Sequence, residues 1–475
     1  MKNQFAKTKI LVTIGPASDT KEKLEALIDA GADGFRLNFS HGNYEYFEHV
    51  FHLINEICVE KSLPIPILID LQGPKIRIGE LSQPEIKVKS GDLLEITTQN
   101  IIGTKEKIST SYVQLIEDAQ IGETILIDDG LIKLVVEEKN KDSLMCRIIE
   151  GGILKPKKGM NLPGMKLSTP SVTEKDFKDL EFALKHRVDF IALSFVRKQE
   201  DIINLRTWLE EKGIKIPLIA KIEKEEAVKD FEKILEVSDG IMIARGDLGV
   251  EIGVQQVPVI QKKIIRRCNE VGKLVITATQ MLESMIKNPV PTRAEVSDIA
   301  NAVWDGTDVV MLSGETSVGN FPVEAVKVMN QILLTTEAEA GHRRDVNYHI
   351  PDNIFENMID ASGAAVVKAA EQMNASAIVI FTHLGIKASI VSKFRPDASL
   401  FAISDKFETL NTLNLHWGIK PFFLDKIYDE EIAITNSTKL LKEKKLIKDG
   451  DVIIFTAGQP MADKGRRTWM RFIVV

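Results

Sequence analysis

Eight short apolar runs recur along the chain, and most of them are followed by a polar segment with a helical pattern. Buried parallel strands read as continuous apolar runs, and strands that alternate with helical segments predict βαβ units. Eight such units predict an α/β fold built on a (β/α)8, or TIM, barrel, whose active site gathers at the carboxyl ends of the strands. The runs are residues 9–15, 34–40, 66–72, 190–196, 217–223, 240–246, 274–280 and 308–314.

Two regions depart from this rhythm. Residues 73–168 hold short alternating runs separated by turn residues, which predicts a small β-barrel inserted into one βα loop. Such an insertion overhangs the active site, so we expect a lid rather than a decorative domain. After about residue 345, strand-like and helical runs alternate again. The predicted domains are a catalytic barrel (1–72 and 169–345), the inserted lid (73–168) and a C-terminal α/β regulatory domain (346–475), with residues 340–352 as the linker.

Composition is that of a large globular enzyme and excludes several classes of protein. The 475 residues include 44% apolar and 27% charged side chains, which is ordinary. A net charge of −7 gives no basic surface for nucleic acid. No apolar run approaches the roughly 18 residues that suggest a membrane span. The three cysteines have no metal-ligand spacing and the N-terminus has no secretory pattern, so we expect reduced thiols in a cytoplasmic protein.

Two carboxylates follow neighbouring predicted strands. Glu223 ends the fifth apolar run and Asp247 follows the sixth. Adjacent barrel strands lie about 5 Å apart, so the two side chains can share a divalent ion such as Mg²⁺, which prefers a few carboxylates plus substrate oxygens. The alternative is a plain ion pair with Lys221, which points to the same side as Glu223. We favour the metal site.

Cations and hydroxyls surround this pair. Lys221 beside a metal is suited to stabilising negative charge on an oxygen, and its acidic neighbour disfavours a Schiff-base role because it keeps the amine protonated. Residues 246–249 can open a helix whose N–H groups bind a carboxylate or phosphate. The remaining candidates are the cations Arg36, Arg77 and Lys158, towards the lid, and the hydroxyls of Thr279 and Ser313, which can pass a proton.

These residues lie in segments that resemble pyruvate kinase. The resemblance runs from residue 8 to about residue 396, through all three predicted domains in order, and its motifs are highly specific. They include FRLNFSHG (35–42), IDLQGPKIRIG (69–79), KKGMNLPG (157–164), AKIE (220–223), IARGDLGVE (243–251), ATQMLESM (278–285) and PTRAEVSDIANAVWDG (291–306).

The resemblance implies transfer of a phosphoryl group from phosphoenolpyruvate to ADP, which gives ATP and pyruvate in glycolysis. It also implies a homotetramer that depends on Mg²⁺, with Mn²⁺ as an alternative ion. The implied metal ligands are Glu223 and Asp247, and the implied catalytic residues are Lys221, Arg36, Thr279 and Ser313. Substrate would contact Arg36, Lys221, Gly246, Asp247 and Thr279, and nucleotide would contact Asn38, His41, Arg77 and Lys158. Asn38, Ser40, Asp70 and the carbonyl of Leu71 match the family's K⁺ site.

One departure from the family concerns the K⁺ site. Many members have Thr-Lys-Gly-Pro-Glu where this chain has Leu71-Gln72-Gly73-Pro74-Lys75. A lysine in place of the glutamate changes the local charge by two units, and its tethered ammonium can stand in for a bound K⁺. We therefore expect that K⁺ is not required and that Lys75 replaces it.

A second departure lies in the C-terminal domain. The family's sugar-phosphate pocket has a hydroxyl-rich turn after a strand, whereas residues 382–389 read THLGIKAS, with Leu384 and Lys387 at expected hydroxyl positions. The terminal loop, within residues 457–470, is also unusual. We expect weak or no activation by fructose 1,6-bisphosphate, and a different phosphorylated effector near Thr382, Lys387 and Ser389.

Two other classes of protein compete with this interpretation. A Mg²⁺-dependent aldolase or lyase would share the carboxylates and an arginine, but it would not need the insertion with KKGMNLPG. A non-catalytic protein on the same scaffold would be expected to lose Lys221 or the metal pair, and neither is lost. A nucleotide-binding assay separates the first alternative from a kinase.

Overall fold

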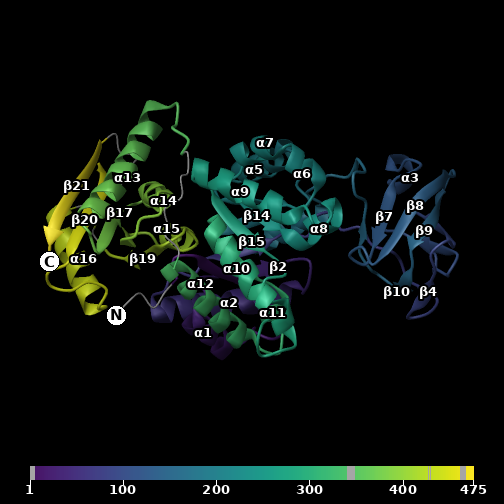
Figure 1. Ribbon diagram of the computed structural model, residues 1–475, viewed down its shortest axis with the longest axis horizontal. Helices are drawn as coiled ribbons and strands as arrows, with labels where there is room; N and C mark the ends of the chain where they lie inside the picture. Colours follow the sequence, from purple (N-terminus) through teal and green to yellow (C-terminus); the bar gives the residue numbers. More distant parts are fainter. Residues whose placement is uncertain (1–5, 340–347, 426, 428, 460–466) are drawn as a thin grey trace.

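Eight parallel strands form a closed barrel in the computed structural model, which describes residues 6–339, 348–425, 427, 429–459 and 467–475 (Figure 1). This confirms the predicted (β/α)8 architecture. The strand order around the barrel is β1-β16-β15-β14-β13-β12-β3-β2. The strands are β1 (Lys9–Thr13), β2 (Gly34–Asn38), β3 (Ile67–Asp70), β12 (Phe190–Leu193), β13 (Leu218–Ile222), β14 (Gly240–Ala244), β15 (Leu274–Ala278) and β16 (Val309–Leu312).

Helices cover the outside of the barrel, and several of them begin at a residue whose side chain caps the first turn. Thr173 and Asp176 form a capping box at the start of α4, and Thr292 and Glu295 form another at α10. The first helix is capped by Thr20, whose hydroxyl accepts a hydrogen bond from the Lys23 N–H. The helices are α1 (Lys21–Ala30), α2 (Tyr44–Lys61), α4 (Glu174–Ala183), α5 (Gln199–Glu211), α6 (Glu225–Lys229), α7 (Phe231–Val237), α8 (Arg245–Ile252), α9 (Val257–Val271), α10 (Arg293–Asp305), α11 (Gly314–Ser317) and α12 (Pro322–Glu339), with a 3-10 turn at Glu283–Ile286.

The helical segment between β13 and β14 is not continuous. It is divided into α6 and α7, because Asp230 leaves the helical region with φ −98° and ψ 17°. The Asp230 carboxylate accepts a hydrogen bond from the Gln199 N–H at 3.3 Å, which ties the break to the start of α5.

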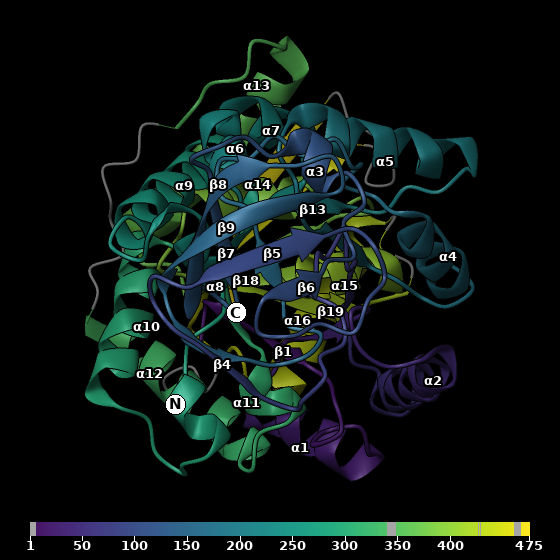
Figure 2. The ribbon, with the colours of Figure 1, turned by 90° about the vertical axis from the view of Figure 1, so that its right-hand side faces the viewer.

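The insertion between β3 and β12 contains its own apolar core. We predicted a small β-barrel, but the strands form a six-stranded sheet, β11-β7-β8-β9-β5-β6, and a separate two-stranded sheet, β10-β4. Both sheets lie at one end of the barrel (Figures 1 and 2). The elements are β4 (Ile86–Val88), β5 (Leu93–Thr97), β6 (Lys107–Ser109), α3 (Leu115–Asp118), β7 (Thr124–Ile127), β8 (Ile132–Lys139), β9 (Ser143–Glu150), β10 (Gly152–Leu154) and β11 (Met160–Asn161).

The C-terminal α/β domain is a five-stranded sheet in the order β19-β18-β17-β20-β21, with β21 antiparallel to β20. Strand β19 was not predicted, because its sequence is short and contains Pro421 at the edge of the sheet. The predicted linker at 340–352 lies partly outside the described residues. The elements are α13 (Ile354–Gln372), β17 (Ala377–Phe381), α14 (Ile386–Lys393), β18 (Ser399–Ser404), α15 (Phe407–Leu413), β19 (Ile419–Phe423), α16 (Glu430–Glu443), β20 (Val452–Gln459) and β21 (Arg467–Val474).

The two added regions lie at opposite ends of the barrel (Figure 1). The insertion follows the carboxyl end of β3 in the chain and precedes α4 and β12, so it lies at the carboxyl ends of the strands. The C-terminal domain contacts their amino ends. Lys9 of β1 donates to the Ile419 carbonyl at 2.7 Å, and Arg395 donates to Asp308, just before β16, at 2.5 Å. In the described residues, no helix is both long and apolar enough to span a bilayer.

Candidate active site

A buried ion cluster lies at the carboxyl ends of β2, β3, β12 and β13, and Asp70 is its centre. One carboxylate oxygen of Asp70 accepts from Arg36 Nε at 2.8 Å and Nη2 at 2.6 Å. The other lies 3.1 Å from Lys221 Nζ and accepts from the Ser194 hydroxyl at 3.2 Å. Lys221 also donates to Ser194 at 2.5 Å. The two predicted cations are therefore held by one carboxylate, with all four side chains buried.

Charge, more than burial, decides protonation in this cluster. Burial alone would raise the pKa of Asp70, but Lys221 and Arg36 outweigh it and lower that pKa. Burial likewise acts to lower the pKa of Lys221, but Asp70 and Glu223 outweigh it and raise that pKa. Lys221 therefore remains an ammonium ion, as expected for charge stabilisation rather than for an imine.

The two predicted metal carboxylates act on each other, with Lys221 as a nearby cation. Glu223 is buried, accepts from the Phe195 N–H at 3.1 Å and lies 3.5 Å from Lys221 Nζ. Burial raises the pKa of Glu223, and the charge of Asp247 raises it further, against the opposing effect of Lys221. Within the described residues, no group of three or more acidic, histidine or cysteine side chains could hold a metal. Two carboxylates that complete their ligand set with substrate oxygens fit Mg²⁺.

Thr279 lies beside the start of α8, in a strained backbone. Its hydroxyl accepts from the Gly246 N–H at 2.8 Å and donates to the Ala278 carbonyl at 2.7 Å. Thr279 has φ +66° and Gln280 has φ +54°, a conformation that is costly for a β-branched residue. The other predicted hydroxyl behaves differently: the Ser313 oxygen is buried and forms no hydrogen bond with any described residue.

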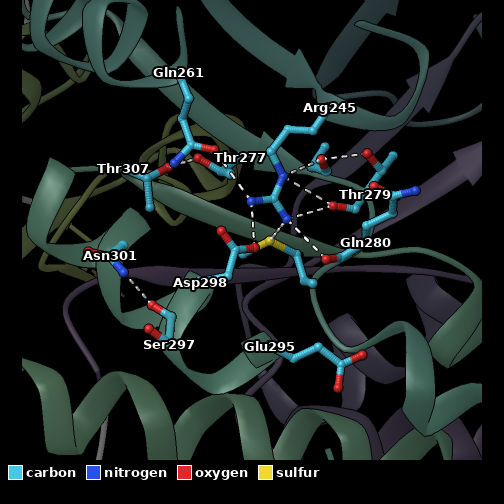
Figure 3. A network of polar contacts seen from close by, with 12 residues as sticks. Arg245, Gln261, Thr277, Thr279, Gln280, Glu295, Ser297, Asp298, Asn301 and Thr307 are labelled. Atoms are coloured by element: carbon cyan, nitrogen blue, oxygen red, sulfur yellow. Dashed lines mark hydrogen bonds and ion pairs between the residues drawn. The ribbon is translucent and has the colours of Figure 1, made fainter. Parts of the chain in front are cut away.

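Arg245 compensates this strain, a role that the sequence did not predict (Figure 3). Its guanidinium donates to the Thr279 carbonyl at 2.8 Å and to the Gln280 carbonyl at 3.1 Å. It also pairs with Asp298 of α10 at 2.6 Å. Arg245 is buried, so these contacts fix the turn that carries Thr279. The only signal in the sequence was its place at the end of an apolar run.

The predicted nucleotide residues are divided between barrel and lid. Arg77 donates to the Lys157 carbonyl at 3.0 Å, and Lys158 pairs with Asp128 at 2.8 Å, so both are bonded within the insertion. His41 is largely exposed at the barrel, and partial desolvation of its ring, together with the charges of Lys75, Arg77 and Arg36, lowers its pKa.

The residues that match the family's K⁺ site are close together but already bonded. Asn38 Oδ1 accepts from the Ser40 N–H at 3.1 Å, and Asp70 holds Arg36 and Lys221. Leu71 is buried and its N–H donates to the Ala192 carbonyl at 3.0 Å. Lys75 is exposed and forms no ion pair within the described part of the chain.

Two of the three predicted effector residues line a cavity of about 820 Å³ in the C-terminal domain. Thr382 and Lys387 line it, whereas Ser389 does not and donates to the Ile386 carbonyl instead. Lys387 donates to the hydroxyls of Ser362 and Thr468. Burial lowers the pKa of Lys387 to about 8. Much of the unusual terminal loop, residues 460–466, lies outside the described residues.

Comparison with known proteins decides the family. The family model "Pyruvate kinase, barrel domain" matches residues 5–326, and "Pyruvate kinase, alpha/beta domain" matches residues 360–473. The chain belongs to the pyruvate kinase family. It is therefore a phosphotransferase, as the sequence predicted.

Relatives agree along nearly the whole chain. A pyruvate kinase of Staphylococcus epidermidis is 42% identical over 471 residues, which is 99% of this chain and 80% of the relative. A pyruvate kinase of Staphylococcus aureus has the same identity and coverage, 42%, 99% and 80%. A crystal structure of a pyruvate kinase from Cryptosporidium parvum superposes with a TM-score of 0.92 at 39% identity, and the match covers 99% of this chain and 96% of that one.

Proposed function

We propose that the chain transfers the phosphoryl group of phosphoenolpyruvate to ADP, giving ATP and pyruvate. The observation that carries this proposal is the cluster in which Asp70 holds Arg36 and Lys221 beside Glu223. Phosphoryl transfer needs positioning and charge neutralisation more than covalent chemistry, and this cluster offers two fixed cations. The test is a coupled assay of pyruvate formation that requires both phosphoenolpyruvate and ADP.

The proposed role of each barrel residue follows from its position in the site. Arg36 and Lys221 would face the transferring phosphoryl group, with Lys221 also stabilising the enolate oxygen left on the substrate. The Gly246 N–H and the Thr279 hydroxyl lie 2.8 Å apart, so one substrate carboxylate can reach both, together with the Asp247 N–H. Thr279 would then take part in delivering a proton to the enolate carbon, and Ser313 would assist it.

Glu223 and Asp247 would hold Mg²⁺, with Mn²⁺ as an alternative. When bound, the ion supplies positive charge to substrate oxygens. The support is the proximity of the two carboxylates, since the charge of Asp247 adds to burial in raising the pKa of Glu223. Asn38, His41, Arg77 and Lys158 would contact the nucleotide.

We propose that the ammonium group of Lys75 replaces a bound K⁺ ion, so that K⁺ is not required. Its ammonium is exposed, and its charge acts with that of Arg77 on His41, whose pKa both lower in addition to burial. The charge of Lys75 is thus felt among the proposed nucleotide residues. Wild-type enzyme should run at nearly full rate without K⁺, and Lys75→Glu should impose a K⁺ requirement or abolish activity. Tenfold or greater stimulation of the wild type by K⁺ would overturn this proposal.

Membership of the family also supports proposals about the regulation, oligomeric state and cellular location of the protein. We propose a cytoplasmic homotetramer with a phosphorylated effector at the cavity lined by Thr382 and Lys387. The support is Lys387, a buried ammonium whose partners are hydroxyls rather than carboxylates among the described residues. An unchanged effector response in Lys387→Ala would contradict the site, and strong activation by low concentrations of fructose 1,6-bisphosphate would contradict the expected effector class.

A further inference from the structure

Two connectors join the lid to the barrel, and they lie side by side. The first connector is residues 71–75, after β3, and the second is residues 166–172, before α4. A Cβ added at Gly73 would lie 3.5 Å from the Ser171 carbonyl and 2.7 Å from the Phe195 ring. Both connectors therefore pass the loop that follows β12, residues 194–198.

Arg197 in this loop holds the second connector directly. Its Nη1 donates to the Leu167 carbonyl at 2.6 Å and its Nη2 to the Thr169 carbonyl at 2.7 Å. The side chain is 14% exposed, and its backbone N–H donates to Asp201 at 2.9 Å, which anchors it to α5. A planar guanidinium holds two acceptors in a fixed geometry that a lysine cannot reproduce.

On the barrel side, the second connector is buried only at its end, at Ser171 and Val172, whereas residues 166–170 are partly or fully exposed. Residues 166–172 line a cavity of about 790 Å³ together with residues of α4 and α5. At the lid side, the Ser168 N–H and hydroxyl are held by Asp118 at 2.9 and 3.1 Å. Arg197 therefore holds a segment that is bordered by a cavity rather than by closely packed side chains.

The other end of the same loop touches the catalytic cluster. Ser194 bonds with Lys221 and Asp70. The next residue, Phe195, has φ +55° and donates its N–H to the proposed metal ligand Glu223 at 3.1 Å. Only two residues, Phe195 and Val196, thus separate Ser194, which bonds with Lys221, from Arg197, which holds the lid connector. Residues 194–198 are thus bonded to the catalytic cluster at one end and to the second connector at the other.

We propose that Arg197 is a positioning residue, which sets the angle of the lid over the barrel and ties that angle to Lys221 and Glu223 through residues 194–198. This rests on the proposed phosphoryl transfer to ADP, since the lid is assigned part of the nucleotide site. Arg197 touches no substrate in this account. It acts by holding two carbonyls of the second connector, so that Arg77 and Lys158 arrive at a defined place.

The test compares Arg197→Met with Arg197→Lys and a matched control, Arg206→Met. Arg206 lies on α5 and also donates to a carbonyl and a carboxylate, of Val237 and Asp239 at 3.0 and 2.8 Å, but both lie within the barrel. Amide hydrogen exchange measures the connector without substrate, and steady-state kinetics measure KM for ADP and for phosphoenolpyruvate separately. Thermal unfolding checks that each variant is folded.

In Arg197→Met, we expect exchange in residues 166–172 to be about tenfold faster and KM for ADP to rise about tenfold, with KM for phosphoenolpyruvate changed less than about twofold. Arg197→Lys should fall between the wild type and Arg197→Met, and it still tests the proposal if Arg197→Met does not fold. Unchanged exchange in the connector, an equal rise in both KM values, or the same changes in Arg206→Met would overturn the assignment. If the wild type transfers no phosphoryl group, the proposed function fails, while the exchange result still reports on Arg197 and the connector.

Discussion

The barrel and the lid hold their proposed active-site cations in different ways. In the barrel, Arg36 and Lys221 are buried and bonded to Asp70. In the lid, Lys158 is 39% exposed and paired with Asp128, and Arg77 is bonded to a backbone carbonyl of the same domain. The barrel cations are fixed by a buried carboxylate, whereas the lid cations would have to exchange partners to reach a nucleotide.

This difference separates two tasks. A buried ion cluster is costly to assemble and costly to break, so it provides fixed charge that does not reorganise during the reaction. An exposed ion pair is worth only about 0–1 kcal/mol, so its members exchange partners easily. The chemistry would therefore depend on the barrel, and nucleotide capture on the mobility of the lid. The following predictions test that division, from the largest expected effect to the smallest.

Replacing residues 73–168 with a short Gly/Ser linker should abolish ATP formation and leave the barrel folded. The ends of the insertion are close, because the Gly73 and Ser171 positions adjoin each other. Arg77 and Lys158 are removed with the lid, while the Asp70 cluster is untouched. A coupled assay measures activity, and Mn²⁺ binding measures the remaining metal site. ATP formation by the truncated chain would contradict the division.

Lys221→Met should lower kcat by at least about two orders of magnitude, since one charge aimed at the transition state is worth about 2.7–4 kcal/mol. The fold should survive, because Arg36 still pairs with Asp70. Some loss of stability is expected, because Glu223 loses the cation 3.5 Å away. Near-normal turnover would show that the barrel cluster does not carry the chemistry.

Arg245→Met should lower kcat by about tenfold while binding of ADP changes little. The substitution removes the donors that hold the Thr279 and Gln280 carbonyls, and with them the support for two left-handed residues. Mutating a residue that positions a reacting group often costs this much. Arg206→Met again serves as the control, on α5. A rise in KM for ADP without a fall in kcat would place Arg245 on the lid side of the comparison.

The architecture could be predicted because each part of it has a local signal. Continuous apolar runs mark strands that are buried on both faces, as in β13, where every residue from Leu218 to Ile222 is buried. Caps such as Thr173 and Thr292 mark helix starts. The helix break at Asp230 and the edge strand with Pro421 depend on tertiary contacts, so sequence patterns missed them.

The site residues could be predicted by type and place, but not by partner. The sequence placed Arg36, Asp70 and Lys221 at strand ends, yet it could not show that Asp70 binds both cations. That pairing depends on side-chain directions across three different strands. Arg245 and Arg197 were missed as positioning residues for the same reason: their acceptors are backbone carbonyls, which have no signature in the sequence.

The smallest effect is expected for Asp128→Asn, which tests the lid side alone. The substitution removes the charge that holds Lys158 at 2.8 Å and frees the lysine for nucleotide. Because exposed pairs are worth at most about 1 kcal/mol, KM for ADP should fall by no more than about fivefold, with kcat unchanged. Glu80→Gln is the matched control, since it removes the partner of the adjacent Lys157 ammonium, at 2.7 Å, and that side chain has no assigned role. That variant should leave KM unchanged. A rise in KM for ADP in Asp128→Asn would mean that Asp128 holds Lys158 in the position that nucleotide requires, and the lid cation would then be preassembled like those of the barrel.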